Sequence, residues 1–188
     1  FGKEVLPLTR DEALQLVEEH IKTKNLIKHM LAAEAILARL AQEFDQDEDT
    51  WRLAGLVHDV DYEQTQHNPE EHGLKSAEIL REHGCPEEVV HAVLAHAEKA
   101  PRESLLDKAL YATDPLTGLI VAAALIHPDK KLASIDAQFI LNRYGEKSFA
   151  RGANRETIAT CQDFGLDLPE FVALGLEAMQ GISKELGL

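Results

Sequence analysis

The chain has 188 residues, a length that fits one domain and can bury a substantial core. Its formal net charge of −14 argues against general binding of DNA or RNA, because a polyanion would be repelled. No uncharged apolar run reaches the roughly 18 residues that span a bilayer, and residues 1–9 lack the pattern of a secretory signal. We therefore expect a soluble, cytoplasmic protein without a membrane partner.

The negative charge suits a site that is loaded with cations, and bound divalent metals would still admit a small anionic substrate. Two cysteines, Cys85 and Cys161, lie far apart and neither has a CxxC partner. We expect both to be buried or half-buried thiols outside any disulfide framework. The sequence leaves the oligomeric state open, a homo-oligomer included.

Apolar residues recur at spacings of three and four along the chain, which is typical of amphipathic helices, and no stretch alternates long enough for a sheet. We predict an all-α, single-domain helical bundle over residues 1–188. The expected helices cover about 10–20, 24–44, 45–58, 69–83, 86–99, 104 onward, 133–144, 154–163 and 169–186.

Local signals set several of these boundaries. Thr9 and Glu12 form a capping box, and Asn68 caps the helix that Pro69 opens. Residues 60–68 are expected to form a polar loop. Pro115 is predicted to kink or interrupt the sixth helix.

The dipeptide His58-Asp59 closes the third predicted helix, after an apolar stretch. At a helix end, an adjacent imidazole and carboxylate can reach one metal ion, whereas in mid-helix the two side chains would diverge by about 100°. Four further candidates lie on other predicted helices, namely His29, His72, His96 and Asp114. Helical metal sites are built from ligands that several helices point into one bundle core.

This ordered set resembles the metal-dependent phosphohydrolases of the HD superfamily over roughly residues 25–119, with residues 130–188 as a helical extension. The resemblance implies one or two divalent ions, of which Mn, Fe, Mg, Ni and Co all suit mixed imidazole and carboxylate ligands. The implied ligands are His29, His58, Asp59 and Asp114 for one ion, and His72, His96 and a bridging Asp59 for the other. His58 and Asp59 would be the catalytic pair.

Two positions depart from patterns of that superfamily. The variant motif His-Asp-Ile-Gly has Val60 and Asp61 here, so we do not assign the chain to that signalling subgroup. Pro115 directly follows Asp114 and bears on the reach of its carboxylate. Residues 111–120 and 146–155 also resemble an uncharacterised bacterial branch of predicted HD hydrolases, which brings no known substrate.

Each candidate also has a purely structural interpretation. His58 and Asp59 would close a helix, and Asp114 would cap a segment that begins at Pro115. The other three histidines would be core or surface residues with ordinary partners. His20 competes with His29 as first ligand. Loop, helix-end or surface positions are expected for His67, His83, His91 and His127.

Basic residues are scarce, so their clustering is informative. Lys147, Arg151 and Arg155 recur every four residues and would share one face of a helix, where they would clamp a substrate phosphate or carboxylate. Lys75, three residues after His72, would also reach a phosphate. The simpler interpretation is that these cations are solvated or ion-paired. Asp61 and Glu63 could orient water or a ligand histidine, but solvation in the loop is the simpler interpretation for them too.

The expected function is hydrolysis of a small phosphate ester or nucleotide by water that two divalent ions activate. One alternative is a di-iron oxygenase, because a few members of the HD superfamily use the same six ligands to oxidise a small molecule with O₂. The second alternative is a non-catalytic domain whose metal only braces the bundle. The substrate and the native metal do not follow from the sequence.

Overall fold

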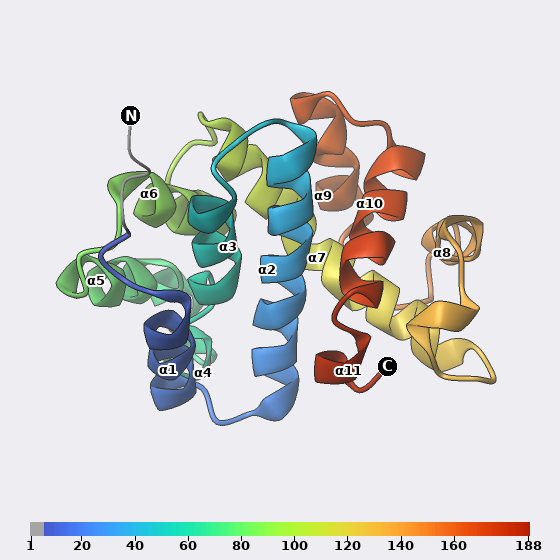
Figure 1. Cartoon of the computed structure of the whole chain (residues 1–188), viewed down its shortest axis with the longest axis horizontal. Coiled ribbons are helices and arrows are strands. Elements are labelled where there is room, and N and C mark those ends of the chain that lie inside the picture. Colours follow the sequence, from blue (N-terminus) through green and yellow to red (C-terminus); the bar gives the residue numbers. More distant parts are fainter. Residues whose placement is uncertain (1–5) are drawn as a thin grey trace.

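The computed structural model describes residues 6–188, and within that range all regular secondary structure is helical, so the predicted all-α fold is confirmed (Figure 1). The α-helices are α1 (Arg10–His20), α2 (Lys24–Glu43), α3 (Glu48–Val57), α4 (Tyr62–Thr65), α5 (Leu74–Glu82), α6 (Glu87–His96), α7 (Leu105–Ile126), α8 (Ala137–Tyr144), α9 (Arg155–Ala159), α10 (Leu168–Gln180) and α11 (Ser183–Leu186). Three 3₁₀ helices join them, η1 (Pro69–Glu71), η2 (Leu132–Ser134) and η3 (Thr160–Phe164). Part of the N-terminal segment that was expected to carry no secretory signal, residues 1–5, lies outside the described residues.

The two longest helices, α2 and α7, form the centre of the bundle (Figure 1). α2 packs against α3, α7 and α10, and α7 also packs against α6, α8 and α9. Ile36, Leu37 and Leu40 recur at the helical period on α2 and are fully buried, which explains why this helix occupies the core. The central pair brings His29 of α2 and Asp114 of α7 to the same part of the molecule.

α7 runs without a break through Pro115, so of the predicted kink or interruption the interruption is wrong. A proline inside a helix removes one backbone hydrogen bond, which normally costs about 3 kcal/mol. Leu110, Leu116 and Leu119 flank Pro115 and are fully buried. Burial of such side chains contributes about 1.5–3 kcal/mol each, enough to outweigh that cost.

By length and composition alone, α7 could also cross a membrane. In the bundle, however, more than half of its most apolar stretch is buried inside the protein, and Asp114 lies within that stretch. These are the properties of a core helix.

The segment between α3 and α5 differs from the expected loop and helix. Residues 60–68 contain the single turn α4, and Asn68 makes no side-chain cap. The chain then passes through η1, takes an extended conformation at His72 and starts α5 only at Leu74. Gly73 explains the break, because it has a φ of +85° and a Cβ there would lie 2.6 Å from Ala97 Cβ.

Helix starts follow local side-chain chemistry. Thr9 caps α1 by accepting from the Glu12 N–H, but the Glu12 carboxylate accepts from the Thr9 hydroxyl instead of its backbone, so only half of the predicted capping box is present. A complete capping box, not predicted, joins Ser104 and Asp107 at the start of α7. α3 starts after Asp47, inside the predicted acidic run.

Each helix predicted in the last third is divided in two. η2 and α8 replace 133–144, α9 and η3 replace 154–163, and α10 and α11 replace 169–186. The side chains of Asp136 and Asn154 cap α8 and α9 and fix where these helices restart. Cys85 and Cys161 are both buried and free, as expected.

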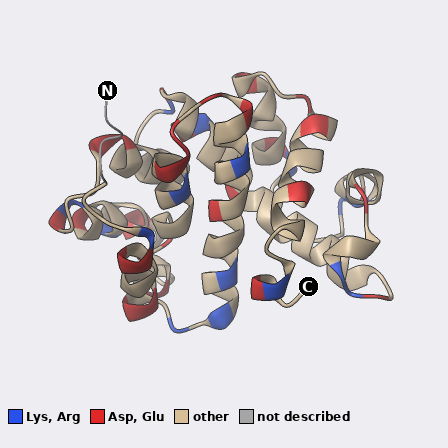
Figure 2. Cartoon of the chain, viewed as in Figure 1, with Lys and Arg blue, Asp and Glu red and all other residues tan. Residues whose placement is uncertain are grey.

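Acidic residues are spread over several elements and not collected in one patch. Figure 2 shows Asp and Glu along α1, in the connection from α2 to α3, and along α10. Many of the basic residues pair with them, as Arg10 does with Glu34 and Arg52 with Glu48.

Candidate metal centre

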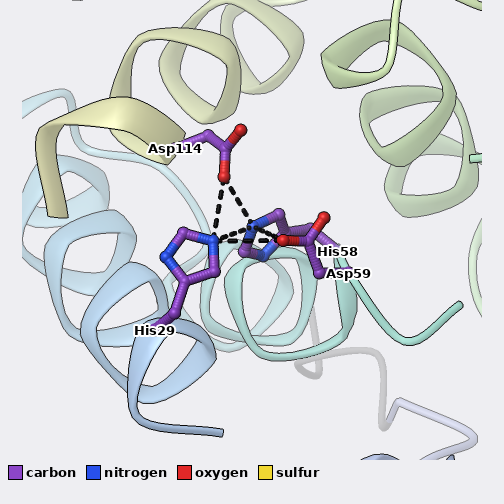
Figure 3. Close-up of side chains that lie close together, drawn as sticks. All are labelled: His29, His58, Asp59 and Asp114. Atoms are coloured by element: carbon purple, nitrogen blue, oxygen red, sulfur yellow. Dashed lines mark hydrogen bonds and ion pairs between the residues drawn. The ribbon is translucent and has the colours of Figure 1, made fainter. Parts of the chain in front are cut away.

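Three elements bring four of the predicted ligands to one point (Figure 3). His29 comes from α2, His58 and Asp59 from the end of α3, and Asp114 from the middle of α7. His29 Nε2 lies 2.9 Å from Asp114 Oδ1 and 3.1 Å from Asp59 Oδ2. His58 Nε2 lies 3.1 Å from the same Asp114 oxygen and 3.0 Å from His29 Nε2. These four ligand atoms lie within 4.8 Å of one another, close enough to hold one ion.

A second group adjoins the first through Asp59. Its other oxygen, Oδ1, lies 3.1 Å from His96 Nε2 and 3.4 Å from His72 Nε2. The three residues again offer ligand atoms within 4.8 Å of one another. Asp59 therefore contacts both groups with different oxygens, the arrangement expected of a carboxylate between two cations.

Helix ends orient two of these histidines. His58 caps α3 and its Nδ1 lies 2.7 Å from the Gly55 carbonyl, while His96 ends α6 and its Nδ1 contacts the Val93 carbonyl. Carbonyls of the last helical turn lack an intrahelical partner and can only accept. Each ring therefore carries its hydrogen on Nδ1 and turns the lone pair of Nε2 toward Asp59 or Asp114.

Side chains orient the other two. His29 Nδ1 lies 2.7 Å from the Thr117 hydroxyl, which donates its own hydrogen to the Asp114 carbonyl and therefore accepts from the ring. His72 Nδ1 lies 2.7 Å from Asp61 Oδ1, a carboxylate that accepts. Both rings, like those at the helix ends, thus present a lone pair at Nε2.

The result is a cluster in which only acceptors face one another. The Nε2 lone pairs of His29 and His58 point at the oxygens of Asp59 and Asp114, and those of His72 and His96 point at Asp59. Buried carboxylates and lone pairs at such distances need a cation between them, either protons or metal ions. Imidazole nitrogens with fixed outer hydrogen bonds are the ligands that divalent transition metals prefer, so these residues fit such ions.

The electrostatics of the cluster agree with this requirement. Burial alone would lower the pKa of His29, but a proton on its Nε2 would be shared with Asp114 and Asp59, and these hydrogen bonds outweigh burial and raise that pKa to about 10. Burial would likewise raise the pKa of Asp59, yet the charge of His58 and the bonds from His29 and His96 hold it well below its usual value. The site therefore takes up positive charge strongly, whether a proton or a metal supplies it.

Asp61 has a structural position that differs from the favoured interpretation of loop solvation. Its side chain is fully buried, and besides His72 it accepts from the N–H groups of Gly73 at 2.7 Å and Ser76 at 2.9 Å. Burial would raise its pKa, but these bonds lower it, so Asp61 is a carboxylate that holds His72 in place. Glu63, by contrast, accepts from the backbone N–H groups of Lys22 and Thr23 and has no contact with the cluster.

A cavity of about 620 Å³ opens at the cluster. His29, His72 and Asp114 form its polar floor, and Asp114 is the most open of the ligands at 34% side-chain exposure. Among residues 6–188, no lysine or arginine lines this cavity, whereas the carboxylate of Glu98 does. Positive charge for an anionic substrate would therefore have to come from bound ions.

The predicted cations lie elsewhere. Lys75 pairs with Glu78 on α5, at 3.6 Å, and does not line the cavity. Residues 147–151 are not helical, so the shared face predicted for Lys147, Arg151 and Arg155 does not exist. The Arg155 guanidinium donates to backbone carbonyls, and a separate cavity lies beside the other two.

The remaining histidines do not join the cluster. His20 and His83 each donate from Nδ1 to the carbonyl four residues earlier, at 3.0 and 2.9 Å. His91 lies 2.8 Å from Asp107, and His127 accepts from the Asp129 N–H. His83 matches His58 and His96 in its place at a helix end, yet among residues 6–188 no carboxylate lies against its Nε2. A helix-end histidine alone is therefore not sufficient for a ligand position.

Of the two residues that orient histidines of the cluster, Thr117 was not assigned that role from the sequence, and for Asp61 it was only the alternative to loop solvation. Thr117 stands in an apolar stretch three residues after Asp114, a spacing that puts both side chains on one face of α7. Asp61 stands where the variant motif has glycine, and that departure was the available signal. Neither feature of the sequence identifies a role by itself. The roles of Thr117 and Asp61 follow from the fold, which places the Nδ1 of a histidine beside each of them.

Comparison with known proteins agrees with this geometry. The sequence model of the family described as "HD domain" matches residues 26–127. A protein named Ribonuclease Y from Oleidesulfovibrio alaskensis is 29% identical over 97 residues, which are 51% of this chain and 18% of that protein. The Ribonuclease Y of Desulfotalea psychrophila is 28% identical over 138 residues, 71% of this chain and 26% of that protein. The Ribonuclease Y of Lawsonia intracellularis is 30% identical over 104 residues, which are 55% of this chain and 20% of that protein. The chain thus spans about a fifth to a quarter of the length of these relatives.

Proposed function

We propose that this chain, which belongs to the HD-domain family, hydrolyses a phosphate ester by water that divalent metal ions activate. The observation that carries the proposal is the convergence of acceptor atoms described above. Four imidazole lone pairs and two carboxylates face one another at the floor of a cavity. Such a set holds divalent cations, and a substrate in the cavity would lie directly against them.

The protein's own residues divide the work between them. Divalent ions, when bound, supply Lewis acidity that lowers the pKa of water and offsets the charge of phosphoryl oxygens. His29, His58, Asp59 and Asp114 would hold one ion, and His72, His96 and Asp59 would hold the other. Asp59 would fix the spacing of the two ions with its two oxygens, and Asp114, on the open side of the cluster, would face water and substrate.

The outer hydrogen bonds keep this arrangement rigid. Thr117, Asp61 and the carbonyls of Gly55 and Val93 each occupy an Nδ1, so no ring can turn without losing a hydrogen bond. Fixed ligands hold charges where the reaction needs them and require no reorganisation during it. This is the contribution that the fold makes to rate.

The volume of the cavity and the names of the similar proteins limit the class of substrate that we propose. A volume of about 620 Å³ is in the range of sites for small molecules, so a small phosphate ester or a nucleotide would fit. The similar proteins are named ribonucleases, which supports a phosphodiester bond in a nucleotide chain as the bond that is cleaved. We propose a phosphodiester of a nucleotide or a short oligonucleotide as substrate, because the net charge of −14 disfavours long nucleic acids.

The test is a reconstitution assay. Metal-free protein is loaded with Mn²⁺, Fe²⁺, Co²⁺, Ni²⁺ or Mg²⁺ and offered bis(p-nitrophenyl) phosphate, nucleotides, sugar phosphates and cyclic dinucleotides. We expect turnover of a phosphodiester that falls at least about a hundredfold in His58→Ala and Asp59→Ala, since metal-dependent activation of water would be lost. His67→Ala removes an exposed histidine outside the cluster and should leave the rate unchanged. Failure of every metal-loaded sample to cleave any of these esters would overturn the proposal.

A further inference from the structure

Arg155, one of the three predicted cations of the C-terminal region, holds a loop together. Its guanidinium donates to the carbonyls of Tyr144 at 3.1 Å and of Ala150 and Ala153 at 2.8 Å. It also donates to the carbonyls of Arg143, Glu146 and Phe149. All of its donor nitrogens are occupied, so Arg155 has none left for a substrate.

These bonds fix the segment from residue 145 to residue 154, which forms part of the cavity wall. Ala150 has a φ of +46°, in the left-handed region that non-glycine residues rarely adopt. Such a conformation persists only where surrounding contacts hold it, and here Arg155 bonds directly to the Ala150 carbonyl. The loop is therefore a defined surface and not a flexible tether.

Lys147 and Arg151 stand on this loop and are exposed. The other seven arginines each bind a carboxylate, a carbonyl or an aromatic ring, as Arg102 does at 3.8 Å from the Tyr111 ring centroid. Arg151 is the only arginine without such a partner within residues 6–188. A free guanidinium on a protein of net charge −14 is available for an external anion.

The position of these two cations connects them to the metal cluster. They line a cavity of about 460 Å³ together with Arg155 and Glu156, so three cationic side chains there outnumber one carboxylate. Ala153 and Asn154 belong both to the wall of this cavity and to the wall of the cavity above the cluster. A chain-like ligand that leaves the metal cluster over these two residues would therefore reach Lys147 and Arg151.

The distribution of charged residues favours binding of two phosphates in two separate cavities. No basic side chain of residues 6–188 lines the cavity above the cluster, so ions there would compensate only the phosphate that reacts. A second phosphate in that cavity would meet Glu98 instead of a cation. Outside it, the same phosphate would meet Lys147 and Arg151, which have no ion-pair partner within residues 6–188, and Glu156 is the one acidic residue among those that line this second cavity.

We propose that Lys147 and Arg151 form a second phosphate-binding site, and that the substrate is a chain with at least two phosphates, such as a short oligonucleotide. The proposal rests on the proposed function, because the metal cluster would take the phosphodiester that is cleaved. Both cations follow the part of the chain that matches the HD family, so the site would be a property of this chain's own C-terminal region. The site would favour substrates that carry a second phosphate next to the phosphodiester that is cleaved.

The experiment compares two substrates that differ by one phosphate. The first is the p-nitrophenyl ester of thymidine 5′-phosphate, and the second is the same ester extended by one nucleotide. In the double variant Lys147→Gln/Arg151→Gln we expect KM for the extended substrate to rise about tenfold, with KM for the shorter one unchanged. The salt dependence of log KM for the extended substrate should also weaken by about one for each cation removed.

Control variants separate this effect from general electrostatics. Lys131→Gln/Lys184→Gln removes the same charge from two exposed positions away from the loop and should change neither KM. Equal KM values in the Lys147/Arg151 variant and the unmodified protein, or an equal rise for both substrates, would overturn the second site.

Binding provides a readout that does not depend on turnover. The Kd of a fluorescein-labelled trinucleotide, measured by fluorescence anisotropy on the metal-loaded protein, should rise about tenfold in the Lys147/Arg151 variant and stay constant in the control. If neither ester is cleaved but this difference in Kd is found, the proposed function fails and the second site stands. If the esters are cleaved and no difference in KM or Kd appears, the second site fails and the proposed function stands.

Discussion

At the scale of single residues, the tautomer of each histidine decides what the site can hold. His58 and His96 receive their tautomer from free carbonyls at helix ends, whereas His29 and His72 receive it from Thr117 and Asp61. In each ring the hydrogen bond at Nδ1 leaves a lone pair at Nε2. A change that reverses one tautomer should therefore remove one metal ligand without altering the fold.

Asp61→Asn makes this reversal at His72. The new side chain cannot accept at both oxygens, and once its carbonyl serves Gly73 and Ser76, its NH₂ group faces His72 Nδ1. The ring would then carry its hydrogen on Nε2, which faces Asp59. We expect the affinity for the second ion to fall about 10- to 100-fold while the first ion still binds, as measured by calorimetric titration with Mn²⁺.

Glu63→Gln is the matched control, because Glu63 lies two residues further along but bonds to Lys22 and Thr23 and to none of the histidines of the cluster. It should bind both ions as the unmodified protein does. Unchanged binding of both ions in Asp61→Asn would contradict the role assigned to Asp61.

The two cysteines give a second test at this scale, one that depends on pH. Burial raises the pKa of the Cys85 thiol to about 11, and burial together with Asp167 does the same for Cys161. At pH 8 about one thiol in a thousand would be the reactive thiolate, against roughly a quarter in an unfolded chain. Labelling by iodoacetamide should be at least about 100-fold slower in native than in urea-unfolded protein and should accelerate as the pH approaches 11. Rapid labelling of native protein at pH 8 would show that the thiols are not buried.

At the scale of secondary-structure elements, the contact between α2 and α3 positions the first half of the cluster. Gly55 lies where the two helices meet, and a Cβ there would come within 2.7 Å of the backbone of Ala33 and Glu34. Gly55→Ala should therefore force the helices apart and lower the free energy of unfolding by about 1–3 kcal/mol. Because the Gly55 carbonyl also orients His58, metal affinity should fall with it.

Gly118→Ala is the comparison that isolates this contact. Gly118 is also helical, but a Cβ there would have nothing within 4 Å. Since alanine favours the helix over glycine, this variant should be neutral or more stable by about 0.5–1 kcal/mol in urea denaturation. If Gly55→Ala and Gly118→Ala lowered the free energy of unfolding equally, the effect at Gly55 would not come from a clash between α2 and α3.

Arg155→Lys tests the loop between α8 and α9. A lysine keeps the charge but has three donors on one nitrogen, so several of the carbonyls now bound by Arg155 would lose their partner. We expect a loss of about 1–3 kcal/mol in the free energy of unfolding, together with faster proteolysis within residues 145–154. Lys147→Gln should leave both unchanged, because Lys147 is exposed. A fully stable Arg155→Lys variant would contradict the structural role of Arg155.

Most of the helices and their ends could be predicted from the sequence. The features that could not be predicted depend on contacts between residues far apart in the chain. The helical period, the cap at Thr9 and the position of His58-Asp59 at a helix end follow from local patterns. The continuity of α7 through Pro115 and the turn at Gly73 depend instead on neighbours far along the chain, such as Ala97. Arg155 fits a helical spacing with Arg151, yet the carbonyls that it binds become visible only in the folded loop.

At the scale of the whole molecule, the order His, His-Asp, His, His, Asp predicted the composition of the cluster. The fold brings these residues together through the crossing of α2 and α7 and the ends of α3 and α6. The sequence could not show that the cavity lacks cations, because that depends on which basic residues pair with the many carboxylates. An anionic substrate in this cavity would therefore need positive charge from bound cations.

Anomalous scattering from a crystal of the protein grown with Mn²⁺ would locate the bound ions directly. Two peaks are predicted, one among His29, His58, Asp59 and Asp114, and the other among Asp59, His72 and His96. Density for Asp59 should lie between the peaks, with one carboxylate oxygen toward each. The absence of any peak at Asp59 in crystals saturated with Mn²⁺ would show that these residues do not form a metal site.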